Sequence, residues 1–390
     1  MDLKPKVIYI AGNIPLPTRS SNKIILDIAG GLAADYDISV IYPKEFCPYP
    51  INRLKKFKYL NGIPEKWEYA GIPIRALKYI RLPYQKSPFA MIKESDKRLL
   101  KLLRSDKPRL IHAHYALPDG YMALTAYKRL GIPYIISLRK SDIENINTAS
   151  GEEGKYRETL CNASAIIVHN RFQQEFLQKR FGADSLIIPH GIEESFLEDR
   201  VLSHKDDIVI SAVGEMIRLK RFDWLIKAIK EYRGCKRPVL RLIGDGPLLN
   251  SLKAEADNAS NIQFYGRQPH DRVRQLLTES DIFALPSVSE TFGLVYMEAA
   301  ATKNAVVAVR DTGVWGNFED GKEMLYIEDY RDFRDSLFRL IDDDDLRIEL
   351  AENAFSRVKK EYLRDTIIGR YNSLYQAIIS EKNQSCPSKS

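Results

Sequence analysis

The sequence is poor in cysteine and has no long apolar run. Its four cysteines are widely spaced and form no C-x-x-C pair: Cys47, Cys161, Cys235 and Cys386. This pattern argues against a disulfide framework or a zinc site and is typical of a reducing compartment. We find no stretch of about 18 apolar residues, so we expect no transmembrane helix. The first residues, MDLKPKVIYIAGNIP, enter a strand-like run without the pattern of a signal peptide. We therefore expect a cytoplasmic location.

Motifs of nucleic-acid and P-loop proteins are also missing. The chain has no phosphate-binding loop of the form G-x-x-x-x-G-K-S/T and no nucleic-acid recognition motif. We therefore expect no nucleic-acid partner. The chain is long: its 390 residues exceed what one compact core usually supports. The length predicts two or more domains.

Positive charge is concentrated in residues 51–86. This segment holds nine Lys or Arg and only two acids, Glu65 and Glu68, so its surplus equals the net charge of the whole chain, +7. Aromatic residues are interleaved with the basic ones. One interpretation is a solvated face with some aromatic packing. The functional alternatives are contact with an anionic membrane surface or a nucleic-acid groove, and no motif supports the second.

Short apolar, β-branched runs alternate with helical stretches along both halves of the chain. This alternation predicts βα units around buried parallel sheets. A polar stretch, 195–207, separates two such sets and is the predicted hinge between domains at 1–194 and 208–362. Ligands of such sheets bind outside the carboxyl ends of the strands, which favours a cleft that the two domains face. The predicted strands are 6–12, 38–43, 109–115, 134–140, 165–170, 185–191, 208–215, 239–246, 262–267, 281–286, 305–311 and 324–329.

The stretch SVSETFGLVYMEA places two acids, Glu290 and Glu298, eight positions apart. Ser287 with Glu290 also matches a capping box, which is the purely structural interpretation. Glu298 has small or apolar neighbours, as in a buried helix, and a buried carboxylate requires partners. Sugar or ribose hydroxyls are suitable partners because a carboxylate accepts several hydrogen bonds. Gly293 would let a ligand approach the backbone.

This stretch resembles the E-x7-E motif of the family-four retaining glycosyltransferases, nucleotide-sugar enzymes of the GT-B fold. Other stretches resemble the same family in the same order: IHAHYALPDGYMALTAYKRLGIPYIISLRKSDI (111–143), IIPHGI (187–192), AVGEMIRLKRFDWLIKAI (212–229), LIGDGPLLNSL (242–252) and IQFYGRQPHDRVRQLLTESDIFALPS (262–287). The resemblance covers most of the chain. It implies two Rossmann-like domains, an N-terminal acceptor side and a C-terminal nucleotide-sugar side. We expect the C-terminal helix and tail, 363–390, to pack back toward the N-terminal domain.

The resemblance also implies roles for single residues. Glu298 would bind the ribose hydroxyls of the donor, and Glu290 would contact the donor sugar near the reacting carbon. Lys220 would neutralise the diphosphate, together with the backbone N–H groups of Leu294 and Val295 at the positive end of a helix. No metal would be required. Gly244 would be a tight-turn glycine close to the cleft.

Several positions depart from the family pattern. Glu215 stands where the family often has an arginine, and Arg218 is the nearest cation that could replace it. Arg139 stands where the family often has a histidine, and it could contact an acidic acceptor or a phosphate. The early loop lacks the usual glycine pair, so Arg19, Ser20 and Ser21 would supply that contact. The glutamate that usually lies near residues 312–316 is also replaced.

Two further interpretations concern metals and hydrolysis. His112 and His114 share one strand face, a spacing that can serve a metal. No third ligand is evident, so a packed or acceptor-side histidine is favoured. The pair Glu290 and Glu298 is a poor hydrolase pair, because eight residues of helix rise about 12 Å and turn the second acid off the first one's face.

The sequence therefore predicts a retaining, metal-independent hexosyltransferase. It would use a nucleotide sugar, with UDP favoured over GDP, and a saccharide or lipid-linked acceptor, in bacterial surface polysaccharide synthesis. The basic segment 51–86 would bring it to the inner face of the cell membrane. The alternative is a degenerate GT-B protein that binds nucleotide sugar or saccharide without transfer, for which Glu215 and Arg139 are the motivation. A phosphorylase, an epimerase or a nucleic-acid-binding protein is less favoured.

Overall fold

The chain folds into two compact units. The computed structural model describes residues 4–19, 23–46, 53, 60, 62–80, 95–148, 151–288, 290 and 292–384. Unit 1 consists of Met1–His169, Gln173–Ile188 and Ile368–Ser390, and unit 2 consists of Asn170–Phe172 and Pro189–Ile367. The polar stretch 195–207 belongs to unit 2 in this division, and its role as a hinge stays a prediction.

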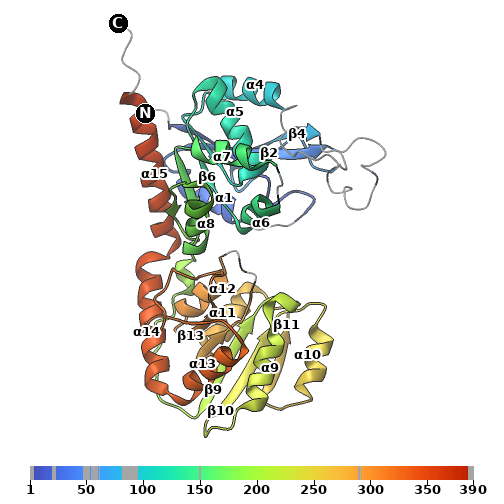
Figure 1. The fold of residues 1–390 in the computed structure, drawn as a ribbon, viewed down its shortest axis with the longest axis vertical. Coiled ribbons are helices and arrows are strands. Elements are labelled where there is room, and N and C mark those ends of the chain that lie inside the picture. Colours follow the sequence, from blue (N-terminus) through green and yellow to red (C-terminus); the bar gives the residue numbers. More distant parts are fainter. Residues whose placement is uncertain are drawn as a thin grey trace. The chain divides into compact units, whose positions relative to one another are not determined.

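The described part of unit 1 is built on an eight-stranded sheet with the order β3-β4-β2-β1-β5-β6-β7-β8 (Figure 1). All neighbouring strands pair in parallel except β3 and β4, which form an antiparallel pair. The order reverses direction between β1 and β5, which makes this the topological switch point of unit 1. The strands are β1 (Lys6–Ile10), β2 (Asp37–Phe46), β3 (Lys66–Tyr69), β4 (Ile72–Ile80), β5 (Leu110–Ala113), β6 (Tyr134–Ser137), β7 (Ala165–Val168) and β8 (Leu186–Ile187).

Helices connect these strands as the alternating pattern predicts. They are α1 (Ile24–Leu32), α4 (Asp96–Asp106), α5 (Tyr121–Leu130), α6 (Lys140–Thr148), α7 (Glu153–Cys161) and α8 (Arg171–Phe181). The central strands are apolar because both of their faces are covered; β5 and β6 are buried along their whole length. The antiparallel pair of β3 and β4 was not predicted, because its residues were interpreted only as part of the basic segment 51–86.

Unit 2 contains a six-stranded parallel sheet with the order β11-β10-β9-β12-β13-β14. Its switch point lies between β9 and β12, where the chain changes the direction in which it adds strands. The two sheets confirm the prediction of two doubly wound α/β domains. The strands are β9 (Asp207–Val213), β10 (Arg237–Ile243), β11 (Ile262–Gly266), β12 (Ile282–Ala284), β13 (Ala305–Val309) and β14 (Leu325–Ile327).

The helices of unit 2 surround its sheet and pack against one another (Figure 1). Helix α9 packs against α10 and α13, while α12 packs against α11 and α14. Phe292 and Tyr296, on either side of Gly293, belong to the hydrophobic core of this unit, so the core anchors the segment between the two glutamates. The helices are α9 (Phe222–Glu231), α10 (Leu249–Ala256), α11 (His270–Thr278), α12 (Leu294–Ala301), α13 (Tyr330–Asp342) and α14 (Asp344–Glu361).

The last helix, α15 (Arg364–Gln384), begins in unit 2 and continues in unit 1 from Ile368 onward. Two of its tyrosines, Tyr371 and Tyr375, are fully buried. The Tyr375 hydroxyl donates to Tyr9 at 2.8 Å and lies 2.5 Å from His112 Nδ1, so this helix completes the interior of unit 1. Among the described residues, no helix is both long enough and apolar enough to cross a bilayer.

Candidate functional site

The loops after β9 and β12 meet at the switch point of unit 2. The loop after β9 contains a single helical turn, η5 (Arg218–Lys220). Its backbone is tied to the loop after β12 by a hydrogen bond from the Val288 N–H to the Leu219 carbonyl, 3.0 Å. The Lys220 ammonium donates to Glu290 Oε1, and both side chains are largely buried, with 17% and 11% exposed. The sheet order therefore pairs the predicted phosphate cation with the predicted sugar-binding acid.

Gly293 begins helix α12 with a left-handed backbone. Its φ is +82°, and an added Cβ would lie 2.6 Å from the Tyr296 ring, so this position requires glycine. The helix starts at Leu294 without a side-chain cap, which means that Ser287 and Glu290 do not form the capping box considered above. The N–H groups of Leu294 and Val295 lie in the first turn, where helical hydrogen bonds do not reach them. Such N–H groups and the helix dipole favour an anion.

Glu298 lies on α12 and is 9% exposed, as its small and apolar neighbours predicted. Its Oε1 is 3.1 Å from Nε2 of His270, the first residue of α11. This hydrogen bond to the carboxylate raises the pKa of His270. The sequence analysis gave Glu298 sugar hydroxyls as partners and missed His270.

Unit 2 contains a pocket of about 320 Å³. Three consecutive loops line it, those after β9, β10 and β11, so it sits at the carboxyl edge of the sheet. Gly244 is on its wall with φ +141°, and an added Cβ would lie 1.9 Å from the Gly214 carbonyl oxygen. Glycine is therefore required for the close approach of two loops, the tight-turn role predicted for it. The lining residues are Val213, Gly214, Glu215, Ile243, Gly244, Asp245, Arg267, Gln268 and Val273.

Glu215 and its candidate replacement cation Arg218 are both on the surface of unit 2. Glu215 is exposed and lines the pocket, so a carboxylate occupies the position where an arginine was expected. Arg218 is exposed on the η5 turn, two residues before Lys220. Its assignment as a replacement cation stays a prediction.

Gly313 contacts Glu290, and the sequence analysis did not predict this contact. It follows β13 with φ +50°, and an added Cβ would come within 3.0 Å of Glu290 Cβ. Its carbonyl accepts a hydrogen bond from the Asn170 side chain at 3.0 Å. The glycine-rich stretch TGVWG (312–316) was the sequence pattern that could have indicated it, but we interpreted that stretch only through its missing glutamate. Gly313 therefore packs the loop after β13 directly against Glu290.

Arg139 lies in unit 1, two residues after β6, and is 8% exposed. Its backbone N–H donates to Asp142 Oδ2 at 2.7 Å, and the other oxygen of Asp142 accepts from Ala116 N at 2.9 Å. Burial raises the pKa of Asp142 to about 7. These residues lie at the carboxyl edge of the unit 1 sheet. Ser20 and Ser21 of the early loop lie outside the described residues.

Comparisons with known proteins assign the family. The family model "Glycosyltransferase Family 4" matches residues 21–196, and "Glycosyl transferases group 1" matches residues 194–357. The D-inositol 3-phosphate glycosyltransferase of Corynebacterium jeikeium is 33% identical over 290 residues, which cover 64% of this chain and 68% of that protein. This chain belongs to the family-four glycosyltransferases.

Two further proteins are similar to this chain. A Bacillus subtilis glycosyltransferase named for teichuronic acid biosynthesis, TuaC, is 28% identical over 304 residues, 74% of this chain and 76% of that protein. HepE of Anabaena, solved in complex with UDP, has a TM-score of 0.69 at 14% identity and covers 96% of this chain and 100% of its own. That likeness shows the fold alone, which is GT-B.

Two hydroxyl groups hold the buried His112 of this glycosyltransferase. His112 has both ring nitrogens in hydrogen bonds, to Tyr375 at 2.5 Å and to Ser137 at 2.7 Å. Its ring stacks on that of His114 at 3.9 Å. Burial lowers the pKa of His112, so the ring is neutral. This arrangement fits the packed histidine that the sequence analysis favoured over a metal ligand.

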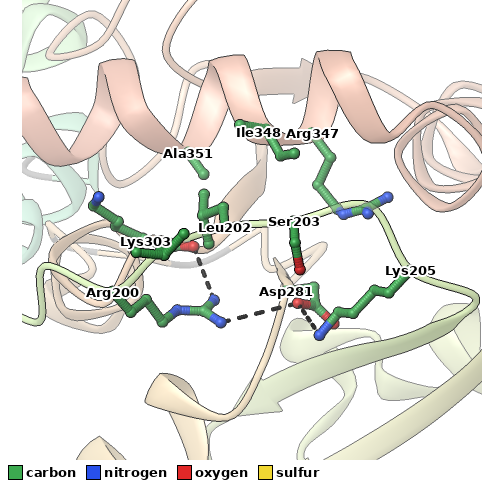
Figure 2. A pocket seen from close by; sticks show the side chains of 10 residues that line it. Arg200, Leu202, Ser203, Lys205, Asp281, Lys303, Arg347, Ile348 and Ala351 are labelled. Atoms are coloured by element: carbon green, nitrogen blue, oxygen red, sulfur yellow. Dashed lines mark hydrogen bonds and ion pairs between the residues drawn. The ribbon is translucent and has the colours of Figure 1, made fainter.

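A second cavity of the glycosyltransferase, about 40 Å³, lies under the chain that leads into β9 (Figure 2). Asp281, at the amino end of β12, is at its centre and accepts from Lys205 at 2.7 Å and from the Val209 N–H at 2.8 Å. Lys303 pairs with Asp199 and Glu352 at 2.7 and 2.8 Å. These cations already have acidic partners, and the cavity is at the opposite edge of the sheet from the candidate site. The residues around this cavity connect the chain that leads into β9 with the sheet.

Proposed function

We propose that this glycosyltransferase is a retaining hexosyltransferase whose unit 2 binds a nucleotide sugar, UDP-linked rather than GDP-linked. The observation that carries the proposal is the convergence of four groups at the switch point of unit 2. These are Lys220, Glu290, the amino end of α12 and Glu298. The Lys220 side chain lies beside Gly214, which lines the pocket of about 320 Å³. Solved HepE contains UDP, which supports a uridine nucleotide here.

The chemistry of the site suits a diphosphate leaving group. As the bond between the anomeric carbon and the diphosphate breaks, negative charge develops on the phosphate oxygens. Lys220 and the N–H groups of Leu294 and Val295 would stabilise that charge where it forms, without the need for a metal ion. Glu298 would accept hydrogen bonds from the ribose, and Glu290 would accept them from the sugar.

We propose transfer with retention by attack on the front face. The oxygen of an acceptor hydroxyl bonds to the anomeric carbon on the face that the diphosphate leaves, and its proton passes to a phosphate oxygen of the leaving group. Unit 1 would bind the acceptor, a saccharide or a lipid-linked saccharide, with Arg139 contacting an acidic group. The name of TuaC supports a role in surface polysaccharide synthesis. A cytoplasmic location stays a prediction.

Attachment to an anionic membrane surface also stays a prediction. Of the segment 51–86, the structure describes only residues 53, 60 and 62–80. Within that part, Lys78 is paired with Glu65 at 2.8 Å and Arg75 with Asp106 at 3.0 Å. Sedimentation with anionic vesicles at low salt tests the idea, and the absence of binding there would remove it.

The central test is binding of UDP, GDP and ADP in the presence of EDTA, measured by thermal shift and calorimetry. A ligand at about 100 times its Kd adds roughly 2.7 kcal/mol of stability. We expect UDP to stabilise the wild type most, and Glu298→Gln to lose most of that gain. Glu349→Gln, at an exposed position on α14, is the matched control. If no nucleotide stabilises the wild type, the proposed donor site is wrong.

A degenerate protein that binds nucleotide sugar without transfer is the second candidate. The exposed Glu215 on the pocket wall favours it, because a carboxylate there repels a diphosphate. Donor consumption separates the two candidates. Formation of free UDP or of a glycosylated product from UDP-sugars, with a mixture of saccharide acceptors, supports the transferase, while binding without either supports the alternative.

A further inference from the structure

His270 and Glu298 form a hydrogen-bonded pair between two helices, of which α11 also contributes Val273 to the lining of the pocket. His270 is the first residue of α11, and its Nε2 is 3.1 Å from Glu298 Oε1 on α12. Within the described part of the chain, this is the hydrogen bond found for the Glu298 carboxylate. One carboxylate oxygen is thus used by the protein, and the other is left for a ligand.

The geometry fixes which nitrogen carries the proton. An ionised carboxylate only accepts hydrogen bonds, so the Nε2 atom of His270 must donate. Neutral imidazole with its hydrogen on Nε2 and the imidazolium ion both satisfy this requirement. The hydrogen bond to Glu298 therefore persists in either charge state of His270.

The ring of His270 is held from a second side. Its centroid lies 4.8 Å from that of Phe196, whose side chain is 3% exposed and belongs to the core of unit 2. Acids face the ring from three elements: Glu298 on α12, Asp271 on α11 itself, and Glu193 ahead of Phe196. Glu193 is already paired with Arg364 at 2.7 Å. Packing and charge together favour one placement of the His270 ring.

We propose that His270 is a positioning residue for ribose recognition. It holds Oε1 of Glu298, so that Oε2 can accept the ribose hydroxyls of the donor nucleotide. This inference rests on the proposed function, in which Glu298 binds the ribose. It assigns to His270 an effect on one part of the nucleotide, the 2′-hydroxyl region, and none on the diphosphate.

The test compares UDP with 2′-deoxy-UDP, and GDP with 2′-deoxy-GDP, by calorimetry on the full chain. In the wild type we expect the ribonucleotide to bind more tightly than its deoxy analogue. His270→Ala should weaken the ribonucleotide by about tenfold, the size of one hydrogen bond to a charged group, and leave the deoxy analogue unchanged. His270→Gln places an amide N–H near the position of Nε2 and should restore most of the preference for ribose.

The matched control is His204→Ala. His204 is also bonded to a carboxylate, Asp345, at 2.9 Å, and its side chain is 63% exposed against 62% for His270. This variant should keep the wild-type ratio of ribonucleotide to deoxynucleotide affinity. Glu298→Gln should give the largest loss of ribose preference. Adding His270→Ala to this variant should cause no further loss of that preference.

Each remaining outcome overturns a different statement. If His270→Ala keeps the wild-type ratio, or weakens both nucleotides equally, His270 has no specific role in ribose recognition. If Glu298→Gln loses the ribose preference while His270→Ala does not, the donor site stands and only the role of His270 is wrong. If the wild type binds no nucleotide, the proposed function fails and this inference fails with it.

Discussion

Lys220 and Glu290 form an ion pair that bridges the loops after β9 and β12, with both side chains largely buried. In the proposed function, both groups bind the donor: the lysine its diphosphate and the glutamate its sugar. A diphosphate that binds Lys220 must therefore share the ammonium group with Glu290 or displace the Glu290 carboxylate from it. Without a ligand, the ion pair holds Lys220 in place and neutralises its charge. We therefore expect the pair to lower the affinity of the site for a nucleotide that carries no sugar.

The first prediction follows from this competition. Glu290→Gln should lower the stability of the empty protein by about 1–3 kcal/mol, because Lys220 is left partly buried without its counter-ion. UDP restores an anion there, so the variant should bind UDP more tightly, by a factor on the order of ten, while transfer is lost. Calorimetry and thermal shift measure these effects, and Glu349→Gln is the control. A loss of UDP affinity equal to that of Lys220→Ala would contradict the competition.

The second prediction concerns Gly293. Gly293→Ala must hold a Cβ at φ +82° and within 2.6 Å of the Tyr296 ring, and that ring is fixed by a hydrogen bond to the Leu285 carbonyl at 2.9 Å. A left-handed residue with a Cβ costs about 1–2 kcal/mol, and the clash adds to this. We expect both a lower free energy of unfolding and a loss of nucleotide binding, because the first turn of α12 must move.

Gly321→Ala separates these two costs. Gly321 has a similar φ, +77°, with no atom within 4 Å of an added Cβ. Its variant should show only the backbone cost in urea unfolding and bind nucleotide normally. Equal effects of the two variants on nucleotide binding would show that the Tyr296 contact is unimportant.

Much of the fold was predictable because buried parallel strands are continuous apolar runs. Every predicted strand is present, with shorter limits in most cases. Strand β4 was missed although Ile72, Ile74 and Leu77 are buried on it. Two of its partly exposed positions carry the basic residues Arg75 and Lys78, and the segment was therefore interpreted through its charge.

The site was predictable only in part. Burial of Glu298 followed from its immediate neighbours, whereas the left-handed backbone of Gly293 was not predicted. The partners of the two acids were not predictable, since Lys220 lies 70 residues from Glu290 and His270 lies 28 residues from Glu298. These pairs depend on the order of strands in the sheet, which local patterns do not specify.

The third prediction is a pH effect from His169. Burial, with the charge of Arg139 adding to it, lowers the pKa of His169 to about 3. Its unfolded pKa is about 6.5, so the neutral ring contributes stability above about pH 6.5, and this is lost as the pH falls toward 3. In His169→Asn, the side-chain amide N–H can replace the N–H that Nδ1 donates to the Ile188 carbonyl, 2.9 Å, but the amide cannot titrate.

The measurement is guanidinium unfolding from pH 6.5 to 3.5. The wild type should lose up to about 1.4 kcal/mol per pH unit relative to His169→Asn. Buried Asp142 acts in the opposite direction in both proteins, since its raised pKa favours the folded state at low pH, and it cancels in the difference. His204→Asn is the exposed control. Parallel pH curves for wild type and His169→Asn would show that His169 titrates alike in the folded and unfolded states.

The fourth prediction concerns the tyrosine of α15 that enters unit 1. The Tyr375 hydroxyl bonds both His112 Nδ1 and Tyr9 Oη, and all three side chains are fully buried. Tyr375→Phe leaves polar atoms of His112 and Tyr9 without this partner in the interior, which should lower the free energy of unfolding by about 1–3 kcal/mol. Tyr127→Phe, where the residue is 41% exposed, should change it by less than about 0.5 kcal/mol. UDP binding to unit 2 should be unchanged in both variants. If Tyr375→Phe were as stable as the wild type, the hydroxyl network would be unnecessary, and α15 would be held in unit 1 by apolar packing alone.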